Sequence, residues 1–479
     1  MTVVVAGAGV GGLACAVRLA RAGRRVLVLE AKSTPGGKAG RLAADGFRFD
    51  TGPSLLTMPW VVRELLGDRI ELMRVEPVTR YRFADGTELE LSADLPRAME
   101  ALEGWSPGAG ADWARFLGVC GSMWRASVPF LTGLPPWPPR RPRPGEPAPD
   151  PRDLIRIRPW HTLRTLARGL VRDLRLRLVI ERFATYAGAD PRRAPAALAV
   201  AGYVEHAFGA WHVRGGIYRI VEALRDRLLE LGGELRLGEP VEALRLEGGR
   251  MTGVVTPNGS YRAQQLVWNG DAAALDRLLP PTAVRLSRRG RAPSLSGFAL
   301  MLGVAGSSER PAHHRIAFPA DTDAEFDAIF EKRRPVEDPT LYVSASSVTD
   351  PAEAPADAEN WFVLVNAPAG ASGGPDWDEE ADRYESHLLA RLEGAGLAPP
   401  GPIVVSHRRT PADLERDSGA PGGAIYGAAP HGRTAAGRRP SVRVAGVRGL
   451  WRVGGSAHPG GGLPLVMLGA ATVAREVGR

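Results

Sequence analysis

The sequence has very little cysteine and no long apolar run. Cys15 and Cys120 are the only cysteines among the 479 residues, so we expect neither a disulfide framework nor a cysteine-ligated metal site. We expect no bound metal of any kind. No stretch reaches eighteen consecutive apolar residues, and the longest approach, residues 463–474, is short and interrupted by glycine. We therefore expect no membrane-spanning helix, so that any contact with a membrane would be peripheral.

An excess of acidic residues is missing as well. Lysine and arginine number 61 against 53 acidic residues, which gives a formal net charge of +8. Such a balance suits nucleic acid, an anionic membrane or an acidic ligand, but a genomic preference for arginine produces it equally. A strand expected from residue 2 leaves no room for a secretory signal. The absence of a secretory signal and the scarcity of cysteine together predict a cytoplasmic protein. We expect no nucleic-acid partner.

The first thirty residues have the pattern of a βαβ unit. Residues 3–6 predict a short buried strand, residues 10–22 a helix, and residues 25–30 a second strand. The crossover helix implies that the two strands pair in parallel. This pattern predicts an α/β fold of the Rossmann type.

Three glycines between the first strand and the helix have the spacing of a dinucleotide-binding loop. Gly7 would form the tight turn, Gly9 would let the backbone approach a pyrophosphate, and Gly12 would let the helix pack on the strand. The helix N-terminus would supply N–H groups and a positive dipole end. Glu30 closes the second strand, where an acidic side chain holds ribose hydroxyls and disfavours a 2′-phosphate.

A second glycine-rich loop favours FAD over a nicotinamide cofactor, because it can wrap a larger molecule. Its candidate cofactor-binding residues are Gly36, Gly37, Lys38, Arg41, Gly52 and Pro53. Two later positions join them: Val241, in a predicted strand over residues 241–247 that would offer backbone groups to an adenine, and Asp271, at the end of another strand.

The middle of the chain predicts a second, mixed sheet and a basic helix. Residues 81–83 and 88–91 predict a hairpin, and residues 295–306, 340–346 and 361–367 predict strands. Residues 134–151 are so rich in proline that we expect a loop or an extended segment. Residues 161–183 have the period of one amphipathic helix studded with arginine. That helix either packs in its own domain with solvated arginines or seats on anionic lipid.

Blocks along nearly the whole chain resemble the carotenoid desaturases of the phytoene-desaturase type, which are FAD enzymes of the amine-oxidase-like superfamily. The opening GAGVGGLACAVRLARAGRRVLVLE is shared by many flavoproteins. More specific are GFRFDTGPSLLTMP, FATYAGADPRRAPAALAVAGYVEHAFGAWHVRGG and the closing GGSAHPGGGLPLV. The proline-rich segment 134–151 has no counterpart in the family pattern, which leaves substrate access the least transferable feature.

The resemblance implies an FAD-binding domain with an inserted mixed α+β substrate-binding domain. We expect residues 1–75, 210–290 and 435–479 to form the first, and residues 76–209 and 291–434 to form the second, membrane-facing one. It also implies that the closing block holds the flavin end of FAD. The candidate residues there are Gly455, Ser456, Gly462, Leu463 and Pro464. The glycines would let the backbone approach the flavin, and the helix starting at the last two would direct N–H groups at it.

The activity implied is the dehydrogenation of an acyclic carotenoid, with a hydride passing to flavin N5 and a proton leaving the neighbouring carbon. Oxygen or a quinone would reoxidise the flavin, and the insoluble substrate implies attachment to the inner face of the cell membrane. The catalytic base is not readable from the sequence. His458, Glu205 and His206 are weak candidates, and each is better explained by a structural role.

The closing block bears on the substrate. Residues 454–460, GGSAHPG, resemble the late-acting members that introduce a C-3′,4′ double bond into coloured, sometimes 1-hydroxylated, carotenoids. Alternatives are a phytoene desaturase, a flavin-dependent terminal carotenoid oxidase, and a non-enzymatic relative that binds prenylated partners. The intact glycine motif and Glu30 argue against the last.

Overall fold

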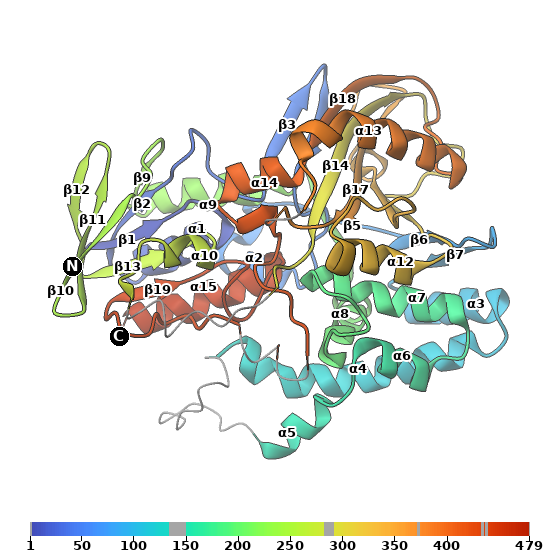
Figure 1. Cartoon of the computed structure of the whole chain (residues 1–479), viewed down its shortest axis with the longest axis horizontal. Coiled ribbons are helices and arrows are strands. Elements are labelled where there is room, and N and C mark those ends of the chain that lie inside the picture. The colour runs from blue at the N-terminus through green and yellow to red at the C-terminus, as the bar shows by residue number, and fades with distance from the viewer. Residues whose placement is uncertain are drawn as a thin grey trace.

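A computed structural model describes residues 2–133, 150–281, 292–370, 374–432, 435 and 439–478. Most of the proline-rich segment predicted over 134–151 lies outside these residues. The two largest sheets and a helical layer form most of the described chain, and both chain ends lie beside the smaller of these two sheets (Figure 1).

The smaller sheet has five parallel strands. In spatial order they are β19 (Leu450–Arg452), β13 (Gln265–Trp268), β1 (Thr2–Ala6), β2 (Arg25–Leu29) and β9 (Glu234–Arg236). Their apolar side chains alternate between the two faces, as expected of a parallel sheet that is covered on both. The predicted βαβ unit and its parallel pairing are confirmed. The strands come from all three segments predicted to form the FAD-binding domain.

Helices cover one face of this sheet and a β-meander covers the other. The helices are α1 (Val10–Arg21), α9 (Tyr218–Glu230) and α15 (Leu463–Gly478), and α1 contacts both of the others (Figure 1). Val3 and Val5 pack on the helix side, whereas Val4 and Ala6 pack on the meander side. The meander consists of β10 (Ala243–Glu247), β11 (Arg250–Thr256) and β12 (Gly259–Arg262).

The larger sheet has seven strands and is antiparallel except for the pair β15–β6. In spatial order they are β18 (Ile403–Arg409), β14 (Ser296–Ala305), β17 (Ala358–Ala367), β16 (Leu341–Ser344), β15 (His314–Ala317), β6 (Thr79–Arg82) and β7 (Glu88–Leu91). One face packs on α13 (Trp377–Gly394), and part of the other on the hairpin of β3 (Arg41–Ala44) and β4 (Phe47–Asp50).

A helical layer completes the fold beneath the larger sheet in the view of Figure 1. It consists of α3 (Leu95–Trp105), α4 (Ala109–Leu131), α5 (Pro151–Arg156), α6 (Leu163–Leu170), α7 (Leu174–Arg182) and α8 (Val200–Phe208). The shorter elements are α2 (Trp60–Leu66), β5 (Leu72–Arg74), β8 (Trp211–Val213), α10 (Ala272–Asp276), α12 (Thr322–Asp327) and α14 (Pro411–Ser418). None of the described helices is long and apolar enough to cross a bilayer.

The prediction of a single helix over 161–183 is wrong. The chain forms α6 and α7, with Val171 in an extended conformation between them. The break has a local cause, because the Asp173 carboxylate accepts hydrogen bonds from the N–H groups of Arg175 and Leu176 and so caps a new helix.

Candidate functional site

The glycine loop is a tight turn that connects the end of β1 to the start of α1. Gly7 has a φ of +102°, and a Cβ on Gly12 would lie 2.1 Å from the Gly7 carbonyl oxygen. A Cβ on Gly9 would lie 2.7 Å from Nδ2 of Asn269. No side chain caps the first turn of α1. Its first N–H groups are therefore not occupied by a capping side chain and could hold a phosphate.

Glu30 lies against this loop. One carboxylate oxygen accepts a 2.6 Å hydrogen bond from the Ala8 N–H, and the Glu30 carbonyl accepts one of 2.7 Å from the N–H of Glu239. The second contact brings the turn that contains Val241 next to Glu30. Val241 is not in a strand, as the sequence predicted, because β10 starts at Ala243. It lies, half-buried, in the preceding turn.

The second glycine loop is seated on the first, since the Gly36 N–H donates to the Ala8 carbonyl at 2.9 Å. The Lys38 side chain reaches a segment far along the sequence, where its Nζ donates to the carbonyls of Ala424 and Ile425 at 3.0 and 2.6 Å. Burial lowers the pKa of Lys38 to about 8. Arg41 is exposed and forms a 3.2 Å ion pair with Glu222.

A polar cavity of about 510 Å³ opens on the outer side of these loops. Gly37, Gly40 and Arg41 line it on one side, and Arg409 and Asp413 line it on the other. Of the residues predicted to bind FAD, Gly37 and Arg41 line this cavity.

The backbone at Gly52 packs directly against the second glycine loop. A Cβ on Gly52 would lie 1.9 Å from the Lys38 carbonyl oxygen, so only glycine fits there. Gly462 has a φ of +89° and precedes α15, with Leu463 and Pro464 in the first turn of that helix. Gly52, Pro53 and these three residues all line a second, larger cavity.

Asp271 and Ser456 meet at one turn, although they are far apart in the sequence. The Ala272 N–H donates to Ser456 Oγ at 2.9 Å, and Asp271 caps α10 by accepting from the Ala273 N–H. The other carboxylate oxygen of Asp271 is buried and has no partner. Gly455 accepts a hydrogen bond from the Arg439 guanidinium at 3.1 Å. An unpaired buried oxygen at this position fits a bound polar cofactor.

The larger cavity has a volume of about 870 Å³ and lies between the seven-stranded sheet and the helical layer. Its wall is predominantly apolar and is contributed by residues from many separate elements. They include Trp124, Phe130, Leu178, Phe183, Val204, Phe318, Phe362 and Leu364. An apolar cavity of this size suits a hydrophobic ligand.

Among the polar side chains of this wall are two hydrogen-bonded groups. In one, Arg182 donates to the Tyr186 hydroxyl at 3.0 Å, and that hydroxyl donates to Glu205 at 2.9 Å. In the other, Ser54, Tyr342 and His314 are joined by hydrogen bonds. All six line the cavity. Apart from Glu205 the sequence did not single them out, because the other five lie on four separate parts of the chain.

The three candidate bases have different surroundings. Glu205 lines the cavity, and burial raises the pKa of its carboxyl. His458 also lines the cavity, but its Nε2 is hydrogen-bonded to the Phe130 carbonyl at 2.8 Å, and burial lowers its pKa to about 4. His206 lies outside the cavity lining and accepts a 3.0 Å hydrogen bond from the Trp113 indole. This placement of His206 argues against the catalytic interpretation.

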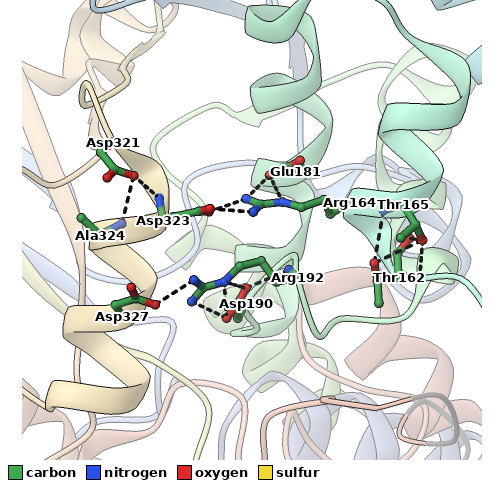
Figure 2. A network of polar contacts seen from close by, with 10 residues as sticks. All are labelled: Thr162, Arg164, Thr165, Glu181, Asp190, Arg192, Asp321, Asp323, Ala324 and Asp327. Carbon is green, nitrogen blue, oxygen red and sulfur yellow. Dashed lines mark hydrogen bonds and ion pairs between the residues drawn. The ribbon is translucent and has the colours of Figure 1, made fainter.

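One arginine of the predicted basic helix, Arg164, takes part in the packing between helices (Figure 2). Arg164 on α6 binds Glu181 on α7 and Asp323 on α12, with closest contacts of 2.6 and 2.5 Å. A second pair of contacts joins Arg192 to Asp190 and Asp327, also on α12. Arg164 therefore belongs to an interior network, which favours packing within the fold, the first of the two interpretations of this helix, although this arginine is not solvated.

One group of side chains in the described residues has the spacing of a cation site. His212, Asp350 and Glu353 are buried, and their ligand atoms lie within 4.8 Å of one another. They already bond to the protein, since His212 Nε2 contacts Glu353 at 3.2 Å and Asp350 accepts from the Gly215 N–H at 2.7 Å. These bonds tie β8 to residues 350–353. The absence of a metal stays a prediction.

Comparison with known proteins identifies the class and then the family. Solved structures with the same fold include an oxidoreductase from Methanosarcina mazei, with a TM-score of 0.65 and 17% identity over 99% of this chain and 100% of that one. A putrescine oxidase bound to putrescine has a TM-score of 0.64 and 14% identity over 100% and 98%. Residues 10–302 match the family of flavin-containing amine oxidoreductases. The chain is an FAD-dependent oxidoreductase of the amine-oxidase fold.

Sequence relatives identify a narrower family within this class. A hydroxyneurosporene desaturase from Cereibacter sphaeroides is 34% identical over 99% of this chain and 97% of that one. A ζ-carotene-forming phytoene desaturase from Myxococcus xanthus is 33% identical over 99% and 93%, and a 4,4′-diapolycopene oxygenase from Methylomonas is 31% identical over 99% and 97%. The chain belongs to the carotenoid desaturase family of FAD enzymes, as the sequence resemblance predicted.

Proposed function

We propose that the chain holds FAD between its two glycine-rich ends and desaturates a coloured acyclic carotenoid. The adenosine diphosphate half would rest on Gly7, Gly9 and Gly12, with Glu30 at the ribose. The flavin half would rest on the closing block. Two features favour this arrangement: the uncapped start of α1 and the unpaired oxygen of Asp271. The division into an FAD-binding and a substrate-binding domain belongs to the same proposal.

The observation that carries the proposal is the apolar cavity of about 870 Å³, whose wall includes the closing block. FAD supplies the hydride acceptor when bound. The chain itself would bind the polyene along the apolar wall, exclude water and fix one bond of the polyene beside Gly462 and Leu463. For the proton that leaves the neighbouring carbon, we propose Glu205 as acceptor, because it is the one carboxylate among the three candidate bases and it lines the cavity.

For the substrate we propose C-3′,4′ desaturation of a coloured acyclic carotenoid that carries a terminal hydroxyl group, with the hydroxyl and the new double bond at the same end of the molecule. The GGSAHPG block and two relatives support it: the hydroxyneurosporene desaturase and a 1-hydroxycarotenoid 3,4-desaturase from a Flavobacterium. The test is expression in hosts that accumulate phytoene, lycopene or 1-hydroxylated lycopene. We expect conversion in the last host, with a product that has lost two hydrogens and kept its oxygen. Conversion of phytoene alone would instead assign a phytoene desaturase.

A terminal carotenoid oxidase is the second candidate, favoured by the similarity to the diapolycopene oxygenase. It would add oxygen to the product, so the same mass analysis separates it. We propose oxygen or a quinone as the acceptor that reoxidises the flavin. The rate of flavin reoxidation, measured with each acceptor in turn, distinguishes them.

We also propose a docking surface for the inner face of the cell membrane on α5 and the residues after it. Leu154, Ile155 and Trp160 are 52%, 61% and 50% exposed. Leu154 also lines the cavity, together with Ile157 and Pro159. Apolar side chains at the cavity mouth would let an insoluble carotenoid pass from lipid to the flavin without crossing water. Exposed arginines on α5 suit anionic headgroups.

A further inference from the structure

The group formed by Ser54, Tyr342 and His314 contains one ring nitrogen that could form a hydrogen bond but has no partner among the described residues. Tyr342 Oη lies 2.5 Å from Ser54 Oγ and 2.8 Å from His314 Nδ1. His314 is only 2% exposed, and its other ring nitrogen, Nε2, is buried without a partner. A buried polar atom that lacks a partner is costly, so a native protein retains one where a ligand or a water completes it.

This group lies in the substrate cavity and close to the proposed flavin site. All three side chains line the cavity, and Ser54 directly follows Gly52 and Pro53. Tyr342 is held over the cavity by its neighbours: its ring stacks on His314, and the Arg182 guanidinium lies 5.7 Å from its centroid. Phe362 and Leu364, on the adjacent strand β17, make the same wall apolar.

We propose that His314, oriented by Tyr342 and Ser54, binds a hydroxyl group at the end of the carotenoid. The inference rests on the proposed function. In a 1-hydroxylated carotenoid that is desaturated at carbons 3 and 4, the oxygen is only a few bonds from the reacting carbons. A hydroxyl-binding group must then lie in the same cavity as the proposed flavin site, and this group shares the cavity with Gly462 and Leu463.

A hydroxyl fits this group better than a carbonyl or a hydrocarbon does. If Tyr342 donates to Nδ1, then Nε2 carries the proton and donates; if Nδ1 donates to Tyr342, then Nε2 accepts. A hydroxyl both donates and accepts, so it completes either arrangement. Burial lowers the pKa of His314 to about 3, which keeps the imidazole neutral at physiological pH. A hydrocarbon end would leave Nε2 unpaired, and such sites discriminate strongly against the analogue that lacks the polar group.

The test measures binding and turnover separately on the FAD-loaded full chain. Two probes differ only in the terminal hydroxyl: 1-hydroxylated lycopene and lycopene. Dissociation constants come from tryptophan fluorescence quenching. We expect the wild-type chain to bind the hydroxylated carotenoid about tenfold or more tightly, as one buried hydrogen bond allows. His314→Leu and Tyr342→Phe should abolish this ratio, mainly by weakening the binding of the hydroxylated carotenoid.

Equal affinity of the wild-type chain for the two carotenoids overturns the inference, and so does a ratio that survives both variants. The second result assigns the group a structural role between β15, β16 and residue 54. Tyr342→Phe removes one oxygen atom, so it keeps the test valid if His314→Leu misfolds. A matched control is Tyr384→Phe, whose hydroxyl is bound to the Val336 carbonyl outside the cavity lining. Preferential binding without turnover would contradict the proposed function while supporting the inference.

Discussion

Replacing Arg164 by Gln should destabilise the protein without affecting its attachment to lipid. The Glu181 side chain is 8% exposed and depends on Arg164 for its ion pair, whereas the third partner, Asp323, is 45% exposed. Removing one member of a buried ion pair typically costs 3–5 kcal/mol, because a buried charge is left uncompensated. Because Arg164 also holds a half-exposed partner, we expect a loss of about 3 kcal/mol, at the lower end of that range.

Urea unfolding followed by circular dichroism measures this loss. The matched control is Arg168→Gln on the same helix, where the side chain is exposed and a change within about 0.5 kcal/mol is expected. Flotation with anionic liposomes should be the same for both variants and the wild-type chain. Unchanged stability of Arg164→Gln together with lost flotation would refute the interior assignment and restore the lipid-facing one.

Four further predictions follow from the same contacts. Gly12→Ala should purify without the yellow flavin band, because its Cβ would meet the Gly7 carbonyl, whereas Gly118→Ala, with open space around it, should keep FAD. Glu205→Gln should keep FAD but lower kcat at least a hundredfold, as loss of a general base does; an unchanged kcat assigns Glu205 a structural role. Folding lowers the pKa of His458 from 6.5 to about 4, so this side chain binds fewer protons in the folded than in the unfolded protein. Its contribution to the free energy of unfolding, on the order of 3 kcal/mol, is therefore complete above pH 6.5 and is lost as the pH falls towards 4. His458→Gln should flatten that part of the unfolding profile, and a profile identical to wild type contradicts it. Ile155→Glu should weaken flotation with anionic liposomes at least tenfold and leave urea stability unchanged; full flotation would exclude α5 as the docking surface.

Local signals in the sequence were sufficient to predict the βαβ unit and its parallel strands. The glycine spacing and the consecutive valines of the first strand follow from backbone sterics and from a sheet covered on both faces. The break between α6 and α7 also had a local signal, since Asp173 precedes the second helix as an N-cap. Helical periodicity over 161–183 outweighed that signal in the prediction.

The substrate side could not be predicted in the same way. Its cavity is lined by side chains from separate strands and helices, so no spacing along the chain indicates that Ser54, His314 and Tyr342 meet. The partner of Arg164 on α12 lies 159 residues away. Periodicity marks which face of a helix is polar, but it does not tell whether that face meets solvent or another element.

A single anaerobic turnover tests the central claim most directly. The FAD-loaded chain is mixed with 1-hydroxylated lycopene in the absence of oxygen, and the flavin band and the product mass are followed together. We predict that the band bleaches as a product two hydrogens lighter, with its oxygen retained, accumulates in equal amount. A product formed without flavin bleaching, or a flavin that stays oxidised beside bound carotenoid, would contradict an FAD-dependent desaturase acting on this substrate.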